Sequence, residues 1–97
     1  MTKQERKEYQ AALKTFNHTC ALCGNTTVEI HHIIYRRNGK TVKENLIPLC
    51  KMHHLLIHSD QKYWTEYLLN INRGHYGIIN IEDLKKQSKY KNFKYSR

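Results

Sequence analysis

Two pairs of metal-type ligands lie far apart in this chain, and they constrain its fold more than any other feature. The first pair is Cys20 and Cys23, and the second is Cys50 and His53. Two residues separate the members of each pair, so each turn can present both side chains to one ion at about 2.0–2.3 Å. Three thiolates and one imidazole are a known structural ligand set for zinc. We therefore expect these four residues to form a zinc clip.

The chain is short, and a short chain buries little apolar surface. Its 97 residues are 39% hydrophobic, with a mean hydropathy of -0.79. A domain of this size buries only about 60–65% of the surface that its unfolded form exposes. Because the free energy of metal binding adds to that of folding, a structural ion is the expected supplement. We predict one domain, residues 1–97, whose folding is sensitive to chelators.

Two other interpretations of these ligands fit the sequence less well. Cys20 and Cys23 alone would also suit a redox motif, but the strand and helix context of thioredoxin-like proteins is missing around them. A finger with two Cys and two His ligands uses about twelve residues between its ligand pairs. About thirty residues separate Cys23 from His54, so the spacing excludes that finger.

Basic residues outnumber acidic ones, which indicates an anionic partner. The 17 Lys and Arg residues and 8 Asp and Glu residues give a net charge of +9, with a pI near 9.6. This is the charge pattern of a protein that binds the nucleic-acid backbone, with solubility as the alternative explanation. The odd number of cysteines, the charged N-terminus and the lack of an apolar run of about 20 residues predict a soluble protein in a reducing, cytosolic compartment.

The first half of the chain predicts a helix and then a hairpin. Thr2 and Glu5 form a capping-box pattern for a helix that ends near residues 17–18, and its apolar face carries Tyr9, Ala12, Leu13 and Phe16. A tight turn over residues 19–24 surrounds the first cysteine pair, and a strand follows over residues 27–31.

The Asn38-Gly39 dipeptide predicts a two-residue hairpin turn within residues 36–40, with a return strand at residues 46–47. Pro48 lacks a backbone N–H, so we expect the return strand to end there.

The second half of the chain predicts helices. One helix of about two turns covers residues 50–58, and Ser59 is the expected N-cap of the next, which ends at residues 73–74. Its apolar stripe is expected to pack against the core, with base stacking as the alternative, and comprises Tyr63, Trp64, Tyr67, Leu68 and Ile71. Asn80 can cap a last helix that reaches Leu84.

A second set of histidines is more than a zinc clip requires. His31 and His32 lie at the end of the predicted strand, where adjacent side chains point to opposite sides, and His54 and His58 share one helix face. Phosphodiester hydrolysis needs a base for water, a cation for the developing charge and help for the departing oxygen. Neutral imidazole, with a pKa near 6.5, can be that base. Ordinary surface or core histidines are the alternative.

Residues 29–33 (EIHHI) and 45–54 (NLIPLCKMHH), followed by His58, resemble an HNH endonuclease. The resemblance covers residues 19–58, about two fifths of the chain. It implies an α+β fold of the ββα-metal type, in which a β-hairpin and a helix surround one catalytic ion, with a zinc clip and with flanking N- and C-terminal helices. It also implies hydrolysis of DNA to a 3′-hydroxyl and a 5′-phosphate.

The resemblance assigns a role to each matching residue. It makes His32 the general base and Asn45 the residue that braces the hairpin loop. It makes His31, His54 and His58 the ligands of the catalytic ion. Many relatives have Asp in place of His31, and a site made only of imidazoles favours Ni²⁺, Zn²⁺, Mn²⁺ or Co²⁺ over Mg²⁺.

Two residues depart from the family pattern. The fourth clip ligand is usually Cys, and here it is His53, whose neighbour His54 leaves open which imidazole binds which ion. The proline commonly found three positions after the base is replaced by Tyr35, which affects the expected hairpin geometry. Glu29 is either a partner of a metal-bound imidazole or a solvated or ion-paired strand residue.

DNA contacts are expected from Arg36, Arg37 and Lys40 and from a basic tail, residues 85–97, that includes Lys85, Lys86 and Lys89. The alternative for the tail is a solvated, disordered end. If the tail contacts phosphates, its deletion flattens the salt dependence of DNA affinity.

The leading hypothesis is a small, metal-dependent HNH DNA endonuclease, of the kind that phages and mobile elements carry, acting in the cytoplasm of a bacterial or phage-infected cell. Its core motif spans residues 19–58, with a helical extension over residues 60–84. The alternatives are a catalytically inactive, zinc-stabilised nucleic-acid-binding module and a toxin- or immunity-type protein with an acidic protein partner. No membrane association is expected, and the sequence does not indicate an oligomeric state.

Overall fold

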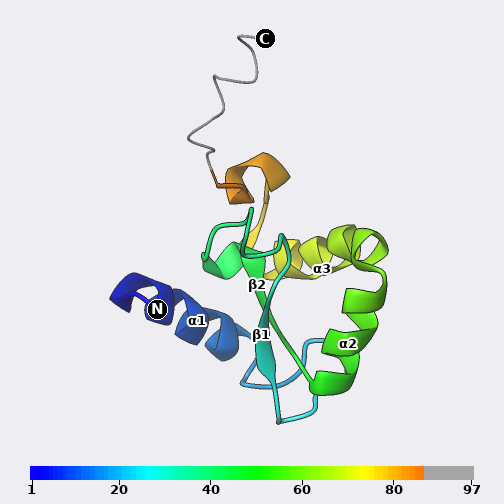
Figure 1. Ribbon diagram of the computed structural model, residues 1–97. Coiled ribbons are helices and arrows are strands. Elements are labelled where there is room, and N and C mark those ends of the chain that lie inside the picture. Colours follow the sequence, from blue (N-terminus) through cyan, green and yellow to red (C-terminus); the bar gives the residue numbers. More distant parts are fainter. Residues whose placement is uncertain (87–97) are drawn as a thin grey trace, which may run out of the picture.

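The computed structural model describes residues 1–86 and places a two-stranded hairpin among helices (Figure 1). The elements in chain order are α1 (Lys3–Thr15), β1 (Glu29–His32), the short 3₁₀ helix η1 (Lys43–Asn45), β2 (Leu46–Leu49), α2 (Lys51–Ser59), α3 (Gln61–Tyr76) and the 3₁₀ helix η2 (Ile81–Leu84). The predicted α+β fold, with a hairpin followed by a helix, is therefore confirmed.

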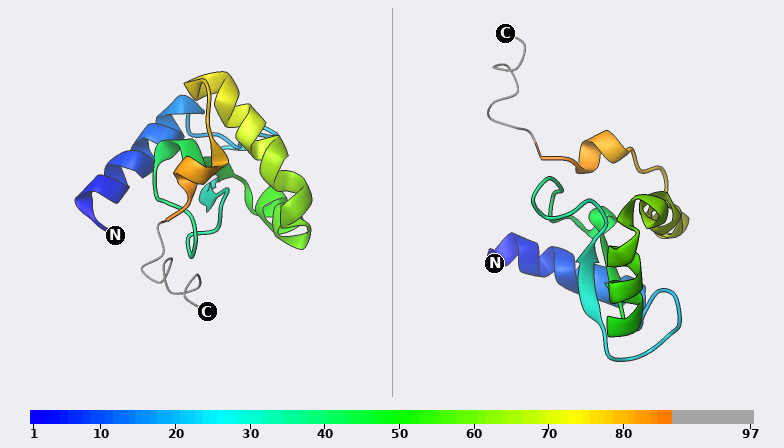
Figure 2. Two further views of the ribbon diagram at one scale, coloured as in Figure 1. Left: turned by 90° about the horizontal axis from the view of Figure 1, so that it is seen from above. Right: turned by 45° about the vertical axis from the view of Figure 1, so that its right-hand side comes forward.

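The hairpin lies between α1 and α2 (Figures 1 and 2). Its strands are antiparallel, with Glu29 opposite Leu49 and His32 opposite Leu46. Successive strand residues point to opposite faces, so neighbouring residues of β1 face different helices. Helix α3 returns over the end of α1, where the Tyr76 hydroxyl donates a hydrogen bond to Thr15 Oγ1 at 2.9 Å.

The hydrophobic core joins the hairpin to α2, α3 and η2, and Cys20 and Cys50 lie within it. Its larger buried side chains are Ile33, Ile47, Leu49, Ile57, Leu68, Leu69 and Leu84. Two of the three thiols of the expected zinc clip are therefore part of the packing that holds the hairpin against α2.

Helix α1 begins and ends as predicted. The Glu5 N–H donates to Thr2 Oγ1 at 3.0 Å, and the Thr2 N–H donates to Glu5 Oε1 at 2.9 Å, which completes the capping box. Asn17 and His18 have φ angles of 55° and 59°, and a right-handed helix cannot continue through residues with such positive angles.

The predicted two-residue hairpin turn at Asn38-Gly39 is wrong, because residues 33–45 connect the strands. The turn over residues 36–38 is present, but it lies inside this longer loop. Gly39 is needed for close approach, since a Cβ there would lie 2.1 Å from the Ile34 carbonyl oxygen. The loop folds back on itself and continues neither strand.

The hairpin strands also differ from the prediction. Strand β1 begins at Glu29 and not at residue 27, and β2 continues through Pro48, which pairs with Ile30, to Leu49. A two-stranded sheet has only edge strands, and an edge strand tolerates proline where its missing N–H does not face the partner. The Pro48 carbonyl still accepts a hydrogen bond, from the Ala21 N–H at 3.0 Å.

The predicted caps of α3 are wrong at both ends. Ser59 closes α2, and the N-cap of α3 is Asp60, whose carboxylate accepts a hydrogen bond from the Tyr63 N–H at 3.4 Å. The helix passes through Gly74 and ends before Gly77, where φ is 88°. A helical glycine costs only about 1 kcal/mol, which the packing of the buried Leu68 and Leu69 can offset.

The apolar stripe predicted for α3 is only partly buried. Leu68 belongs to the core, whereas the side chains of Tyr63 and Tyr67 are 67% and 51% exposed. The packing prediction is therefore wrong for these two tyrosines. Within residues 1–86, the helices are too short or too polar to span a membrane.

Candidate active site

The Cys and His residues predicted to form the zinc clip come together in space. Their ligand atoms, one from each residue, all lie within 4.8 Å of one another. Cys23 Sγ lies 3.7 Å from Cys50 Sγ, and His53 Nδ1 lies 3.8 Å from Cys20 Sγ and 3.2 Å from Cys50 Sγ. A tetrahedral zinc site with bonds of about 2.3 Å to S and about 2.1 Å to N has edges of about 3.8 Å and about 3.6 Å. The cluster can therefore bind zinc through three sulfurs and His53 Nδ1.

The charge state of the Cys20 thiol also suits a cation. Burial alone would raise the pKa of Cys20, but backbone hydrogen bonds, from Cys50, Leu22 and Cys23, lower this pKa to about 6. A thiolate therefore forms at neutral pH and can serve as a metal ligand. The sulfurs of Cys23 and Cys50 are too far apart for a disulfide, whose S–S bond is about 2.05 Å.

A second group of ligands forms between β1 and α2. We call His31, His54 and His58 the imidazole cluster, because their ligand atoms lie within 4.8 Å of one another. The ring centroids are 5.0 Å apart for His31 and His54, and 4.6 Å apart for His54 and His58. The adjacent residues His53 and His54 therefore belong to different clusters.

The imidazole cluster contains a neutral nitrogen donor that suits a metal ion. His31 is 2% exposed, and its buried Nε2 has no hydrogen-bond partner within the part of the chain that the structure describes. Burial, followed by the charges of the neighbouring histidines, lowers the pKa of His31 to about 3. The ring is therefore neutral at physiological pH, with an unpaired nitrogen beside two more imidazoles, as a divalent ion requires.

Replacing His31 with Gln is expected to flatten the acid dependence of stability. The pKa of His31 is 6.5 in the unfolded chain and about 3 in the folded protein. The contribution of His31 to the free energy of unfolding is therefore complete above pH 6.5 and declines as the pH falls. Between pH 6 and pH 5 the wild type should lose about 1 kcal/mol more unfolding free energy than His31→Gln. Denaturant titrations of both proteins, each with one equivalent of zinc, measure this difference, and equal losses would contradict it.

Two side chains outside the cluster hold its rings. Glu29 Oε1 lies 3.0 Å from His54 Nδ1, and this hydrogen bond is the main cause of the lowered pKa of Glu29. The hydroxyl of Tyr35 lies 2.7 Å from His58 Nδ1. Glu29 therefore contacts an imidazole, and its side chain is also 62% exposed, so features of both interpretations of Glu29 are present.

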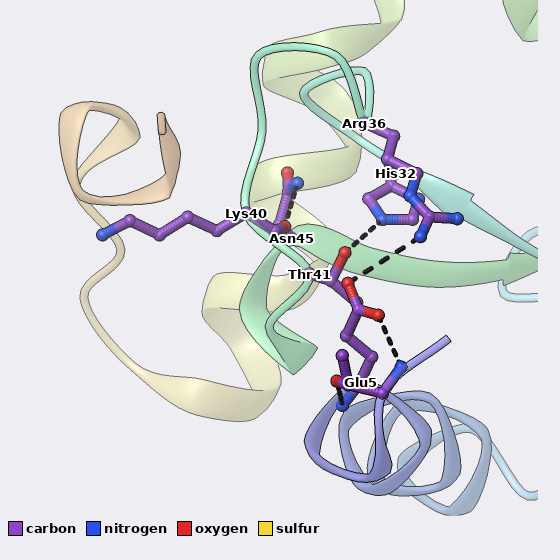
Figure 3. Close-up of polar contacts among 7 residues, drawn as sticks. Glu5, His32, Arg36, Lys40, Thr41 and Asn45 are labelled. Carbon is purple, nitrogen blue, oxygen red and sulfur yellow. Dashed lines mark hydrogen bonds and ion pairs between the residues drawn. The ribbon is translucent and has the colours of Figure 1, made fainter. Parts of the chain in front are cut away.

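His32 faces away from the imidazole cluster, toward α1 and the loop. Its Nε2 lies 3.0 Å from the Thr41 hydroxyl (Figure 3). Its ring also meets the Tyr9 ring edge to face, with centroids 6.1 Å apart. Burial lowers the pKa of His32, and the positive charges of Arg36 and Lys86 lower it further. His32 is therefore neutral at physiological pH and able to accept a proton.

Asn45 makes three side-chain hydrogen bonds to the backbone of the loop. It is fully buried, and its Oδ1 accepts a hydrogen bond from the Ile34 N–H at 2.8 Å. Its Nδ2 donates to the carbonyls of Ile34 and Lys40 at 3.1 and 2.8 Å (Figure 3). These bonds fix the loop that begins directly after His32 and carries Thr41.

The predicted DNA-contacting residues lie in different places. Arg36 lies beside His32, with its guanidinium 3.8 Å from Glu5 Oε2, whereas the side chain of Lys40 points away from His32 (Figure 3). The Lys86 N–H donates to the Asn38 carbonyl at 2.7 Å, which anchors the start of the basic tail at the loop. Arg37 is exposed, Lys85 pairs with Glu82 at 3.0 Å, and Lys89 lies outside the described residues.

Three contacts of these histidines and of Arg36 were missed from the sequence. Thr41 and Tyr35 lie in the loop, and only the fold shows that they meet His32 and His58. Glu5 was recognised only as a capping residue, although it also pairs with Arg36. The one available signal was Tyr35, because it stands at a departure from the family pattern.

Comparison with known proteins agrees with this geometry. The model of the HNH endonuclease family matches residues 20–60. Neither a curated protein nor a solved structure gives a significant match to the chain. The HNH family generally comprises nucleases that use divalent metals and act on DNA. The stretch that matches the HNH endonuclease family, residues 20–60, therefore carries all the residues of both ligand clusters.

Proposed function

We propose that this protein is a divalent-metal-dependent endonuclease that hydrolyses DNA phosphodiester bonds, with His32 as general base. One observation carries the proposal: the ligand atoms of the imidazole cluster converge around His31, and the next residue of β1 is the neutral, buried His32. Zinc in the clip has a structural role in this proposal, and the imidazole cluster holds the catalytic ion. The all-nitrogen donor set favours Ni²⁺, Mn²⁺, Co²⁺ or Zn²⁺ over Mg²⁺, which prefers oxygen ligands.

The contacts of His32 indicate which of its nitrogens acts. In this proposal Nε2, which lies 3.0 Å from the Thr41 hydroxyl, carries the ring proton and donates a hydrogen bond to Thr41 Oγ1, an atom that can both donate and accept. Nδ1 is then the acceptor that takes a proton from the attacking water. The bound ion supplies positive charge for the developing charge on the phosphoryl group. Thr41 and the loop braced by Asn45 keep His32 oriented for this step.

Basic side chains provide the contacts with the DNA backbone in this proposal. Arg36, beside His32, is placed to meet a phosphate near the scissile bond once it leaves Glu5. Lys86 is held near the same loop, and the tail beyond it extends the positive charge. These contacts position the substrate and do not read its sequence.

Plasmid cleavage by the wild type tests the proposal. Supercoiled plasmid is incubated with protein and Mg²⁺, Mn²⁺, Ni²⁺, Co²⁺ or Zn²⁺, and nicked and linear products are separated on a gel. We expect cleavage with at least one ion of the nitrogen-preferring group and none with excess chelator. Binding of DNA without cleavage under any ion would favour the catalytically inactive module.

Replacing Thr41 with Val is expected to slow cleavage without weakening substrate binding. Valine keeps the shape of threonine but removes the hydroxyl that holds His32 Nε2. Loss of one such hydrogen bond corresponds to about a 3- to 10-fold lower kcat. Initial rates measure kcat and KM, and Thr41→Ser, which keeps the hydroxyl, should restore kcat. A change confined to KM would contradict this role.

A further inference from the structure

We infer that Tyr35 is a positioning residue of the metal centre, and that its phenol holds His58 so that Nε2 faces the other imidazoles. This inference rests on the proposed metal site but not on the proposed DNA cleavage. It assigns a role to a residue that stands where relatives commonly have proline. The first support is the short contact of 2.7 Å between the phenol oxygen and His58 Nδ1.

The backbone of Tyr35 is fixed before its side chain reaches His58. Its carbonyl accepts two hydrogen bonds, from the Asn38 and Gly39 N–H groups at 2.8 and 2.7 Å. The ring is half-buried and lies edge to face with His31, with centroids 6.2 Å apart. Because its backbone and its ring are both held by neighbouring groups, the Tyr35 side chain is restrained and can in turn restrain His58.

The three imidazoles differ in how much the fold restrains them. His31 is buried, His54 is half-buried and paired with Glu29, and His58 is exposed in the last turn of α2. An exposed side chain at a helix end keeps most of its rotamer freedom, which metal binding must remove. The Tyr35 phenol therefore supplies at His58 the restraint that burial supplies at His31.

The hydrogen bonds also select one nitrogen on every ring. A neutral imidazole has one N–H and one acceptor nitrogen, so a ring that binds a cation through Nε2 carries its proton on Nδ1. His54 Nδ1 then donates to Glu29 and His58 Nδ1 donates to Tyr35, while His31 Nε2 is already without a partner among residues 1–86. All three rings thus offer Nε2 to a common point.

Nickel binding tests this role without relying on activity. Protein with one equivalent of zinc is titrated with Ni²⁺ by calorimetry, comparing wild type, Tyr35→Phe and Tyr67→Phe, which removes an exposed phenol on α3. We expect Tyr35→Phe to bind Ni²⁺ about 10- to 100-fold more weakly and Tyr67→Phe to match wild type. His54→Asn, which lacks a ligand, should lose the second site. Equal affinity of Tyr35→Phe and wild type would overturn the inference.

A measurement on the wild type avoids dependence on the folding of the variant. With a second equivalent of Zn²⁺, long-range ¹H–¹⁵N NMR spectra should show His58 bound through Nε2 and protonated at Nδ1. Binding through Nδ1, or no second site, would overturn the inference whatever the plasmid assay shows. Metal binding as expected but without DNA cleavage would instead leave the inference standing and remove the proposed nuclease function.

Discussion

Replacing His32 with Ala is expected to abolish plasmid cleavage. A positioned general base contributes about 10²- to 10⁴-fold to a rate. The other histidines belong to the clip or the imidazole cluster, follow the end of α1 (His18) or lie in the last turn of α3 (His75). His32 is buried, neutral and held by Thr41, so no solvent molecule can take its place with the same orientation. The initial rate of nicking under the best divalent ion measures the loss.

Three measurements on His32→Ala and one matched variant separate catalysis from folding and binding. His32→Ala should keep its zinc content, its Ni²⁺ affinity and its affinity for plasmid DNA, because His32 belongs to neither cluster. His18→Asn is the matched variant, since it removes an exposed imidazole at the end of α1 and Asn tolerates the positive φ angle there. It should cleave at the wild-type rate. A His32→Ala protein that retains a tenth or more of the activity would contradict the assignment.

Substitution of the adjacent histidines 53 and 54 is expected to have opposite effects. His53→Asn removes a ligand from the zinc clip, where His53 Nδ1 lies 3.2 Å from Cys50 Sγ. A structural zinc contributes about 10–16 kcal/mol of apparent binding free energy, which matches or exceeds the total stability of about 5–15 kcal/mol of most domains. We therefore expect His53→Asn to lose bound zinc and cooperative thermal unfolding.

His54→Asn should behave in the opposite way. Its ring contributes to the imidazole cluster and to the contact with Glu29, but not to the clip. The variant is expected to keep one zinc, a wild-type circular dichroism spectrum and a cooperative unfolding transition, and to lose the second metal site and cleavage. Elemental analysis and thermal melts of His53→Asn and His54→Asn measure the bound zinc and the stability of each variant. Unfolding caused by His54→Asn but not by His53→Asn would reverse the assignment of the clusters.

Local sequence patterns predicted much of this fold and candidate site. The capping box of Thr2 and Glu5, the two ligand pairs and the i, i+4 spacing of His54 and His58 each depend on residues close together in the chain. Such patterns carry their geometry within one turn or one helix. The resemblance then linked these local pieces, and the structure brings the same two groups of residues together in space.

Contacts that depend on the path of the long loop could not be predicted. The contacts of Thr41 with His32 and of Tyr35 with His58 depend on how residues 33–45 fold, and the Asn38-Gly39 dipeptide suggested a much shorter turn. Asn45 and the close approach of Gly39 to Ile34 decide that path. Whether a strand continues through Pro48 likewise depends on whether the position of its missing N–H faces the partner strand. No local sequence pattern gives that information.

Helix α2 connects the two clusters directly. Cys50 is its N-cap residue and His53 lies in its first turn, while His54 and His58 follow on the same helix. An oxidant or alkylating agent that modifies the thiols would release the start of this helix and displace the rings further along it. Thiol-reactive compounds should therefore inhibit the proposed cleavage although no cysteine belongs to the imidazole cluster, and a reducing environment should protect the second metal site as well as the fold.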